Sequence, residues 1–163
     1  MRDVDIFAAA LNLNAAWQIA SVDLSIESSQ VLIQVEHVGP ALCPECGKEV
    51  PIHDHSGVRE WRHLDTMQFS TVVRCRVPRG KCAEHGVFQV KIPWADPGAR
   101  LTRGFEEWII RVLELTKSQI RTAKLLRLTA HQVHDVMHRA VRRGLSRRRL
   151  GAIEHVSLDE KSY

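Results

Sequence analysis

Two short segments, Cys43-Pro44-Glu45-Cys46-Gly47 and Cys82-Ala83-Glu84-His85-Gly86, decide how the middle of this chain folds. Each segment carries two metal-binding side chains with two residues between them, followed by a glycine that can take the positive φ of a tight turn. The 35 residues between them contain a predicted β-hairpin that brings the segments together. The spacing therefore predicts a zinc ribbon, in which structural Zn²⁺ is held by Cys43, Cys46, Cys82 and His85.

Other cysteine and histidine side chains nearby are alternative ligands. Cys75 falls on one face of a predicted strand with Met67, Phe69, Thr71, Val73 and Val77, a pattern that favours a buried thiol. His53 and His55 are expected in a polar loop near the site, and His63 is expected to be structural. No thioredoxin-like βαβ pattern surrounds the motif, which favours zinc over a redox dithiol.

Around the zinc ribbon the sequence predicts an α+β chain. A short helix is expected over residues 4–12 and strands over 17–23 and 31–38, whereas residues 102–145 have only helical patterns. The Pro97-Gly98 pair separates the two regions. We expect an N-terminal helix and β-hairpin at 1–40, the zinc ribbon at 41–98, a helical unit at 99–149 and a further segment at 150–163.

The helical region has the layout of a helix-turn-helix. Thr102 is a predicted cap for a first helix, and Ser118 for a short second helix that ends near Arg127. Thr129 with Gln132 three residues later forms a capping-box start for a third helix, which Gly144 is expected to end. The predicted buried face of the third helix consists of Val133, Val136, Met137, Ala140 and Val141.

Positive charge is concentrated in this helical region. Residues 100–150 hold 13 Lys and Arg and 4 Asp and Glu, or +9, whereas residues 1–99 hold 9 and 12, or −3. Such a concentration indicates a polyanionic partner, and double-stranded DNA fits a helix-turn-helix. The third helix is then expected to present His131, Gln132, His134 and Asp135 to base edges, with Gln132 suited to adenine. Phosphate contacts are expected from Arg121, Lys124, Arg139, Arg142 and Arg143.

No stretch reaches the roughly 20 apolar residues of a membrane span, and the N-terminus lacks the apolar run of a secretion signal. We therefore expect a cytoplasmic protein. In a reducing compartment, four cysteines are better explained as metal ligands or core thiols than as disulfides.

The order of these motifs resembles the DDE transposases of the ISL3 family. The resemblance includes both metal-binding segments, Trp61-Arg62-His63-Leu64-Asp65, Val90-Lys91-Ile92-Pro93-Trp94-Ala95, the basic helix-turn-helix and Ser157-Leu158-Asp159-Glu160-Lys161. It implies recognition of the terminal inverted repeats of a mobile element, followed by the truncated first strand of an RNase H-like catalytic domain.

The resemblance also implies that Asp159 is the first of three catalytic carboxylates that bind Mg²⁺ in a longer parent protein. The other two are expected beyond Tyr163, so this chain alone is not expected to catalyse transposition. Low affinity per module favours a homodimer on paired DNA sites.

Two other functions stay open. The chain can be a stand-alone DNA-binding regulator, which would bind specifically without cleavage. It can also be a non-DNA interaction module, in which neutralising Arg139, Arg142 and Arg143 would change no nucleic-acid affinity.

Overall fold

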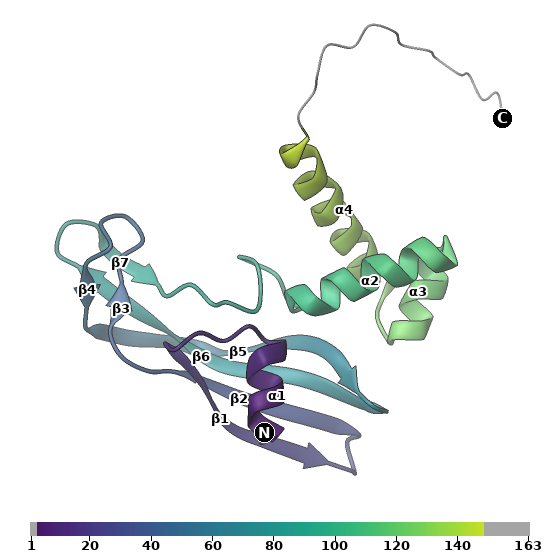
Figure 1. Cartoon of the computed structure of the whole chain (residues 1–163), viewed down its shortest axis with the longest axis horizontal. Coiled ribbons are helices and arrows are strands. Elements are labelled where there is room, and N and C mark those ends of the chain that lie inside the picture. Colours follow the sequence, from purple (N-terminus) through teal and green to yellow (C-terminus); the bar gives the residue numbers. More distant parts are fainter. Residues whose placement is uncertain (1–2, 149–163) are drawn as a thin grey trace, which may run out of the picture. The chain divides into compact units, whose positions relative to one another are not determined.

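The computed structural model describes residues 3–148, which form two compact units, residues 3–108 and 109–148 (Figure 1). We call them the β-rich unit and the helical unit, and α2 begins in the first and ends in the second. The predicted α+β class is confirmed. In chain order the elements are α1 (Asp3–Ala10), β1 (Trp17–Ser25), β2 (Gln30–His37), β3 (Ala41–Leu42), β4 (Glu49–Val50), β5 (Ile52–Thr66), β6 (Phe69–Cys82), β7 (Gly86–Gln89), α2 (Arg103–Thr116), α3 (Gln119–Leu126) and α4 (Ala130–Arg147).

One five-stranded sheet, with the order β1-β2-β6-β5 and β7 paired to β6, forms the frame of the β-rich unit. The strands β5 and β6 form the expected long antiparallel hairpin, and β1 pairs antiparallel with β2. The β2 and β6 strands pair in parallel, from Gln30 opposite Ser70 to Val35 opposite Cys75. Strands from either side of the expected boundary at residue 40 therefore share one sheet, because their apolar side chains cover the same face.

That face carries the core. Val31, Ile33 and Val35 of β2 lie in it, together with Thr71, Val73, Cys75 and Val77 of β6. Above them Trp94 stands edge-on between Trp17 and Trp61, with ring centroids 5.0 and 5.5 Å away. Each tryptophan buries about 200 Å² of largely apolar surface, so the trio contributes several kcal/mol to the core. Met67, predicted on this face, is instead 86% exposed in the β5–β6 turn with a φ of 56°.

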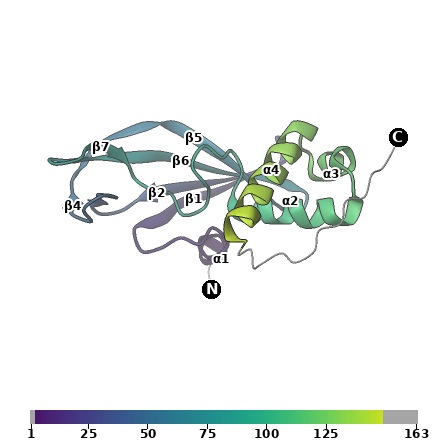
Figure 2. The same cartoon turned by 90° about the horizontal axis from the view of Figure 1, so that it is seen from above.

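The small β3–β4 sheet holds the first metal-binding turn and lies with β7 at one end of the β5–β6 hairpin, whereas α1 packs on β1 (Figure 2). Gly80 of β6 permits this close packing. A Cβ atom at Gly80 would lie 2.7 Å from the Phe88 ring, 2.8 Å from Ala41 Cβ and 2.9 Å from Val50 Cγ2. Real Cβ atoms essentially never make contacts this short, so any larger residue at Gly80 would force these neighbours to shift.

The start of α2 belongs to the β-rich unit. The Thr102 hydroxyl accepts a hydrogen bond from the Phe105 amide at 3.4 Å, which confirms the predicted cap. His63 Nδ1 lies 2.7 Å from the same hydroxyl, and both side chains are buried. Burial, and secondarily the Arg62 charge, lowers the pKa of His63 to about 4. His63 is therefore a neutral structural residue at neutral pH, as the sequence indicated.

The helical unit has the predicted helix-turn-helix. Ser118 caps α3 by accepting from the Arg121 amide, and the helix ends at Arg127, whose φ of 54° and ψ of 45° are left-handed. Thr129 starts α4 with a complete capping box. Ala123, Val133 and Val136 are buried, which brings the two helices together. Two expectations were wrong. Val141 is 54% exposed, and α4 continues past Gly144 to Arg147.

Candidate metal centre and nucleic-acid interface

The structure brings the four predicted zinc ligands together at one end of the β5–β6 hairpin. Cys43 and Cys46 come from the turn between β3 and β4, whereas Cys82 and His85 come from the turn between β6 and β7. Their ligand atoms all lie within 4.8 Å of one another. Each turn ends in a glycine with positive φ, 70° at Gly47 and 75° at Gly86, because the chain reverses there around the site.

Three of the six distances between ligand atoms match those of tetrahedral zinc, and all six lie within 4.8 Å. Zn–S bonds of about 2.3 Å and Zn–N bonds of about 2.0–2.1 Å place two sulfurs about 3.8 Å apart, and sulfur about 3.6 Å from nitrogen. The Sγ atoms of Cys46 and Cys82 are 3.9 Å apart, and His85 Nδ1 lies 3.6 Å from the Sγ atoms of both Cys43 and Cys82. Four soft or borderline ligands at tetrahedral spacing favour zinc over Mg²⁺ or Ca²⁺, which prefer oxygen.

The local electrostatics lower the pKa of two of the three ligand thiols, which favours their thiolate form. Backbone amides at Glu84 and His85, followed by the His85 ring, lower the pKa of Cys82 to about 6. A backbone amide of the first turn likewise lowers the pKa of Cys43. A backbone amide also lowers the pKa of Cys46, but desolvation and the other two thiols outweigh it, so this pKa is raised. Because zinc binds thiolates, metal binding would release the remaining protons.

The alternative ligands lie elsewhere. Cys75 is fully buried in the sheet core, where burial raises the pKa of its thiol to about 12. Such a thiol stays neutral and inert. The expectation that His53 and His55 lie in a loop was wrong, since both belong to strand β5. Their side chains are exposed there. Neither belongs to the group of side chains that could hold a metal. The β5 strand pairs with β6 over nearly its whole length, which leaves no loop at these positions.

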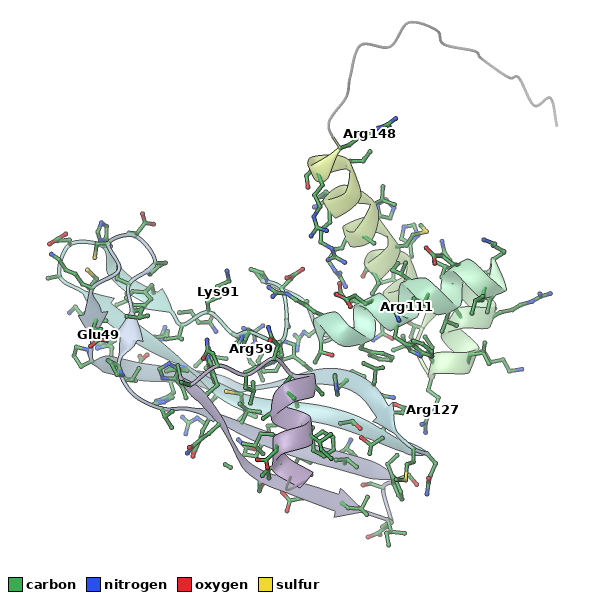
Figure 3. The ribbon with its side chains drawn as sticks, in the orientation of Figure 1. Glu49, Arg59, Lys91, Arg111, Arg127 and Arg148 are labelled. Carbon is green, nitrogen blue, oxygen red and sulfur yellow. The ribbon has the colours of Figure 1, made fainter. Side chains whose placement is uncertain are left out.

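The helical unit carries the positive charge. Residues 109–148 hold ten Lys and Arg against two Asp and Glu, or +8. Arg111 on α2, Arg127 in the turn before α4 and Arg148 at the end of α4 are three of these cations (Figure 3). Of the predicted phosphate contacts, Arg121 and Lys124 are exposed on α3 and Arg142 is exposed on α4; Arg139 and Arg143 are half-buried.

Four positions on the outer side of α4 form one stripe, of which three are exposed and Asp135 is half-buried. Val133 and Val136 define the buried side of α4. Residues separated by three or four positions lie on one side of a helix, and one such series lies opposite these two valines. This stripe consists of His131, Asp135, His138 and Arg142. His131 Nε2 lies 3.5 Å from Asp135 Oδ2, and the rings of His134 and His138 are 4.4 Å apart. The spacing of His138 from His131 and Arg142 is the signal that could have added it to the predicted set.

Gln132 has a different environment from the rest of the predicted base-contacting residues. Its Oε1 accepts hydrogen bonds from the Thr129 amide at 2.9 Å and the Thr129 hydroxyl at 3.2 Å. A carbonyl oxygen has two lone pairs, so both are used by the cap. Bidentate contact with adenine would require this oxygen as an acceptor, and Gln132 would have to leave the capping box to make it.

Comparison with known proteins matches both parts of the chain to one group of transposases. Residues 39–85 match a family model described as the zinc-finger of transposase IS204/IS1001/IS1096/IS1165. Residues 90–141 match a second model, the helix-turn-helix domain of transposase family ISL3. The chain carries the zinc-ribbon and helix-turn-helix domains of the ISL3 transposases. Together with the ligand geometry, the first match supports structural zinc, and the second makes this a DNA-binding chain.

Two curated relatives extend the match over the whole chain. Both are described as the transposase for insertion sequence element IS1557, from Mycobacterium tuberculosis strains CDC 1551 / Oshkosh and H37Rv. Each is 26% identical over 172 aligned residues, which cover 100% of this chain and 38% of the relative. The chain therefore spans well under half the length of these relatives. No solved structure matches the chain.

The ISL3 resemblance also assigned Asp159 a catalytic role. Asp159 lies outside the described residues 3–148, as does the predicted first strand of the RNase H-like domain. Within residues 3–148, none of the helices has both the length and the apolar character needed to cross a membrane.

Proposed function

We propose that this chain binds the terminal inverted repeats of an insertion element through α4 and so positions a transposase on the element ends. The observation that carries the proposal is the combination of a capped recognition helix with a net charge of +8 in the helical unit. Phosphate contacts from such a unit supply affinity without sequence information, whereas side chains on the exposed stripe of α4 would supply base selection.

The metal centre has a supporting role in this proposal. Zinc would join the β3–β4 turn, which is held by two strands of two residues each, to the β6–β7 turn at the end of the long strand β6. Small metal sites gain much of their folding energy from the ion, so the zinc ribbon would stay folded only while the metal is bound. The residues that would hold it are the four named above, and all of them belong to the β-rich unit.

We extend the proposal to the longer protein that the relatives suggest. In a transposase of this kind, Asp159 would provide the first carboxylate ligand of catalytic Mg²⁺, and two copies of the chain would bind the two ends of an element. Support for this comes from the matched domains and from the relatives' description as transposases.

Footprinting tests the proposal. The zinc-loaded chain is bound to a DNA fragment that contains one end of the element flanking its own coding sequence, and backbone cleavage is mapped on both strands. We expect protection confined to the inverted repeat, on one face of the duplex and centred on a major groove. Uniform weak protection along the whole fragment would contradict end recognition and leave only non-specific binding to phosphates.

A further inference from the structure

Asp135 is an unusual residue for the face of a helix that meets DNA. Among residues 109–148 the only carboxylates are Glu114 on α2 and Asp135 on α4, against ten Lys and Arg. Asp135 lies on the exposed stripe, and its side chain is 46% exposed. A carboxylate in the groove of a polyanion is repelled by the phosphates. Its presence there weakens binding unless it accepts a hydrogen bond from the DNA.

Helix stability does not explain this carboxylate. Asp135 pairs with His131 one turn earlier, at 3.5 Å, but the His131 side chain is 83% exposed, and exposed pairs of this kind contribute little. The order of the pair is also unfavourable. Pairs at this i,i+4 spacing stabilise a helix best when the acidic residue comes first, and here the histidine comes first.

The chemistry of the major groove limits what a carboxylate can contact. Guanine presents two acceptors and thymine presents an acceptor and a methyl group, so both repel or exclude it. Adenine presents an amino donor beside the N7 acceptor. If the amino group bonded one carboxylate oxygen, N7 would face the other oxygen, and two acceptors repel each other. Cytosine presents its N4 amino group without a neighbouring acceptor on the same base. Cytosine is therefore the base that an acidic side chain fits best.

We propose that Asp135 is a specificity-determining residue that accepts a hydrogen bond from the N4 amino group of a cytosine in the bound DNA. Asp135 Oδ2 lies 3.5 Å from His131 Nε2, and 46% of the Asp135 side chain is exposed, so a base in the groove could reach the carboxylate. His131 is then a positioning residue that orients the carboxylate. This inference rests on the proposed function, because it requires α4 to lie in the major groove.

The test starts with selection from a randomised duplex library by the zinc-loaded full chain. Dissociation constants are then measured for the selected duplex and for each single base-pair replacement. For the unmodified chain we expect one C·G pair whose replacement weakens binding about 5-fold or more, the lower end of the effect of a specific base contact. Asp135→Ala is expected to lose discrimination at that pair while it keeps discrimination at the others. Asp135→Asn is expected to shift the preference there toward A·T, since an amide suits adenine.

Glu114→Gln is the matched control. It removes the other negative charge of the same unit, but from an exposed position on α2. We expect it to tighten binding to all duplexes slightly and to leave every base preference unchanged. If Asp135→Ala behaves in the same way, Asp135 contacts no base and the inference is wrong. If the unmodified chain selects no sequence at all, the proposed function fails as well, and the two failures are thereby distinguished.

Discussion

Replacing Cys82 with serine tests the metal centre most sharply, because the same strand supplies a matched control. Cys82 and Cys75 both lie on β6 and both are buried, but only Cys82 belongs to the metal group. Structural zinc sites bind with an apparent free energy of about 10–16 kcal/mol from four ligands. Loss of one ligand therefore removes roughly a quarter, about 3 kcal/mol, and weakens zinc affinity about 100-fold or more.

Cys75→Ser places a hydroxyl in the sheet core instead. A buried hydroxyl without a partner costs about 1–3 kcal/mol of stability, so this variant is also destabilised. Stability alone cannot separate the two variants, but zinc content can. We expect one zinc per chain in the unmodified protein and in Cys75→Ser, and loss of zinc from Cys82→Ser under the same chelator.

The assay is metal analysis of each purified chain after dialysis against graded chelator, with circular dichroism to confirm folding. If Cys75→Ser does not fold, Cys75→Ala, which buries no polar group, replaces it. Undiminished zinc affinity in Cys82→Ser would refute the ligand assignment. Loss of zinc from a folded Cys75 variant would do the same.

Three further predictions follow from particular contacts. Gly80→Ala forces a Cβ against Phe88, Ala41 and Val50, so we expect a loss of about 1–3 kcal/mol in urea unfolding, whereas Gly57→Ala, with nothing within 4 Å, changes little. His63 has a pKa of about 4 in the folded chain and of 6.5 in the unfolded chain. As the pH falls, the unfolded chain therefore takes up a proton first, which favours unfolding. Stability is full above pH 6.5 and falls by up to about 3 kcal/mol as the pH approaches 4. The test compares urea unfolding of the unmodified chain and of His63→Gln, whose side chain does not titrate, at pH 7 and at pH 4. If both proteins lose the same stability between these pH values, His63 is not the cause. Arg142→Ala is expected to weaken binding to all duplexes alike and to reduce the slope of log affinity against log salt by about 1. Its control is Arg74→Ala, which removes a cation paired with Glu60 in the β-rich unit. If Arg142→Ala changes the affinity only for duplexes that differ at one base pair, Arg142 does not contact a phosphate.

The sequence predicted the features that depend on local spacing. Cys43 and Cys46 could be paired with Cys82 and His85 because each pair lies on one tight turn and needs only a hairpin to meet the other. Thr129 and Gln132 could be recognised as a capping box for the same reason, since the motif lies within four residues. Such signals do not depend on the rest of the fold.

Features set by non-local packing could not be predicted. The parallel pairing of β2 with β6 joins segments about 40 residues apart, and its register depends on the shared core face. The same pairing network extends β5 through His53 and His55, which the sequence placed in a loop. Gly144 is a frequent helix terminator, but here its modest cost within the helix is tolerated and α4 continues to Arg147.

The dual potential of Gln132 illustrates another limit. From the sequence its amide suits both a capping box and an adenine, and both were predicted. Only the structure shows that Oε1 is fully used by Thr129. The choice between two hydrogen-bonding roles depends on coordinates, because the residue type is right for either.

The central claim is that this chain selects the ends of a mobile element by sequence. The most direct measurement is the ratio of its dissociation constants for an inverted-repeat duplex and for a scrambled duplex of equal length, with zinc loaded and at physiological salt. We predict a preference of about 10³-fold or more for the inverted repeat. Equal, salt-sensitive affinity for both duplexes would contradict the account and leave the helical unit as a non-specific basic surface.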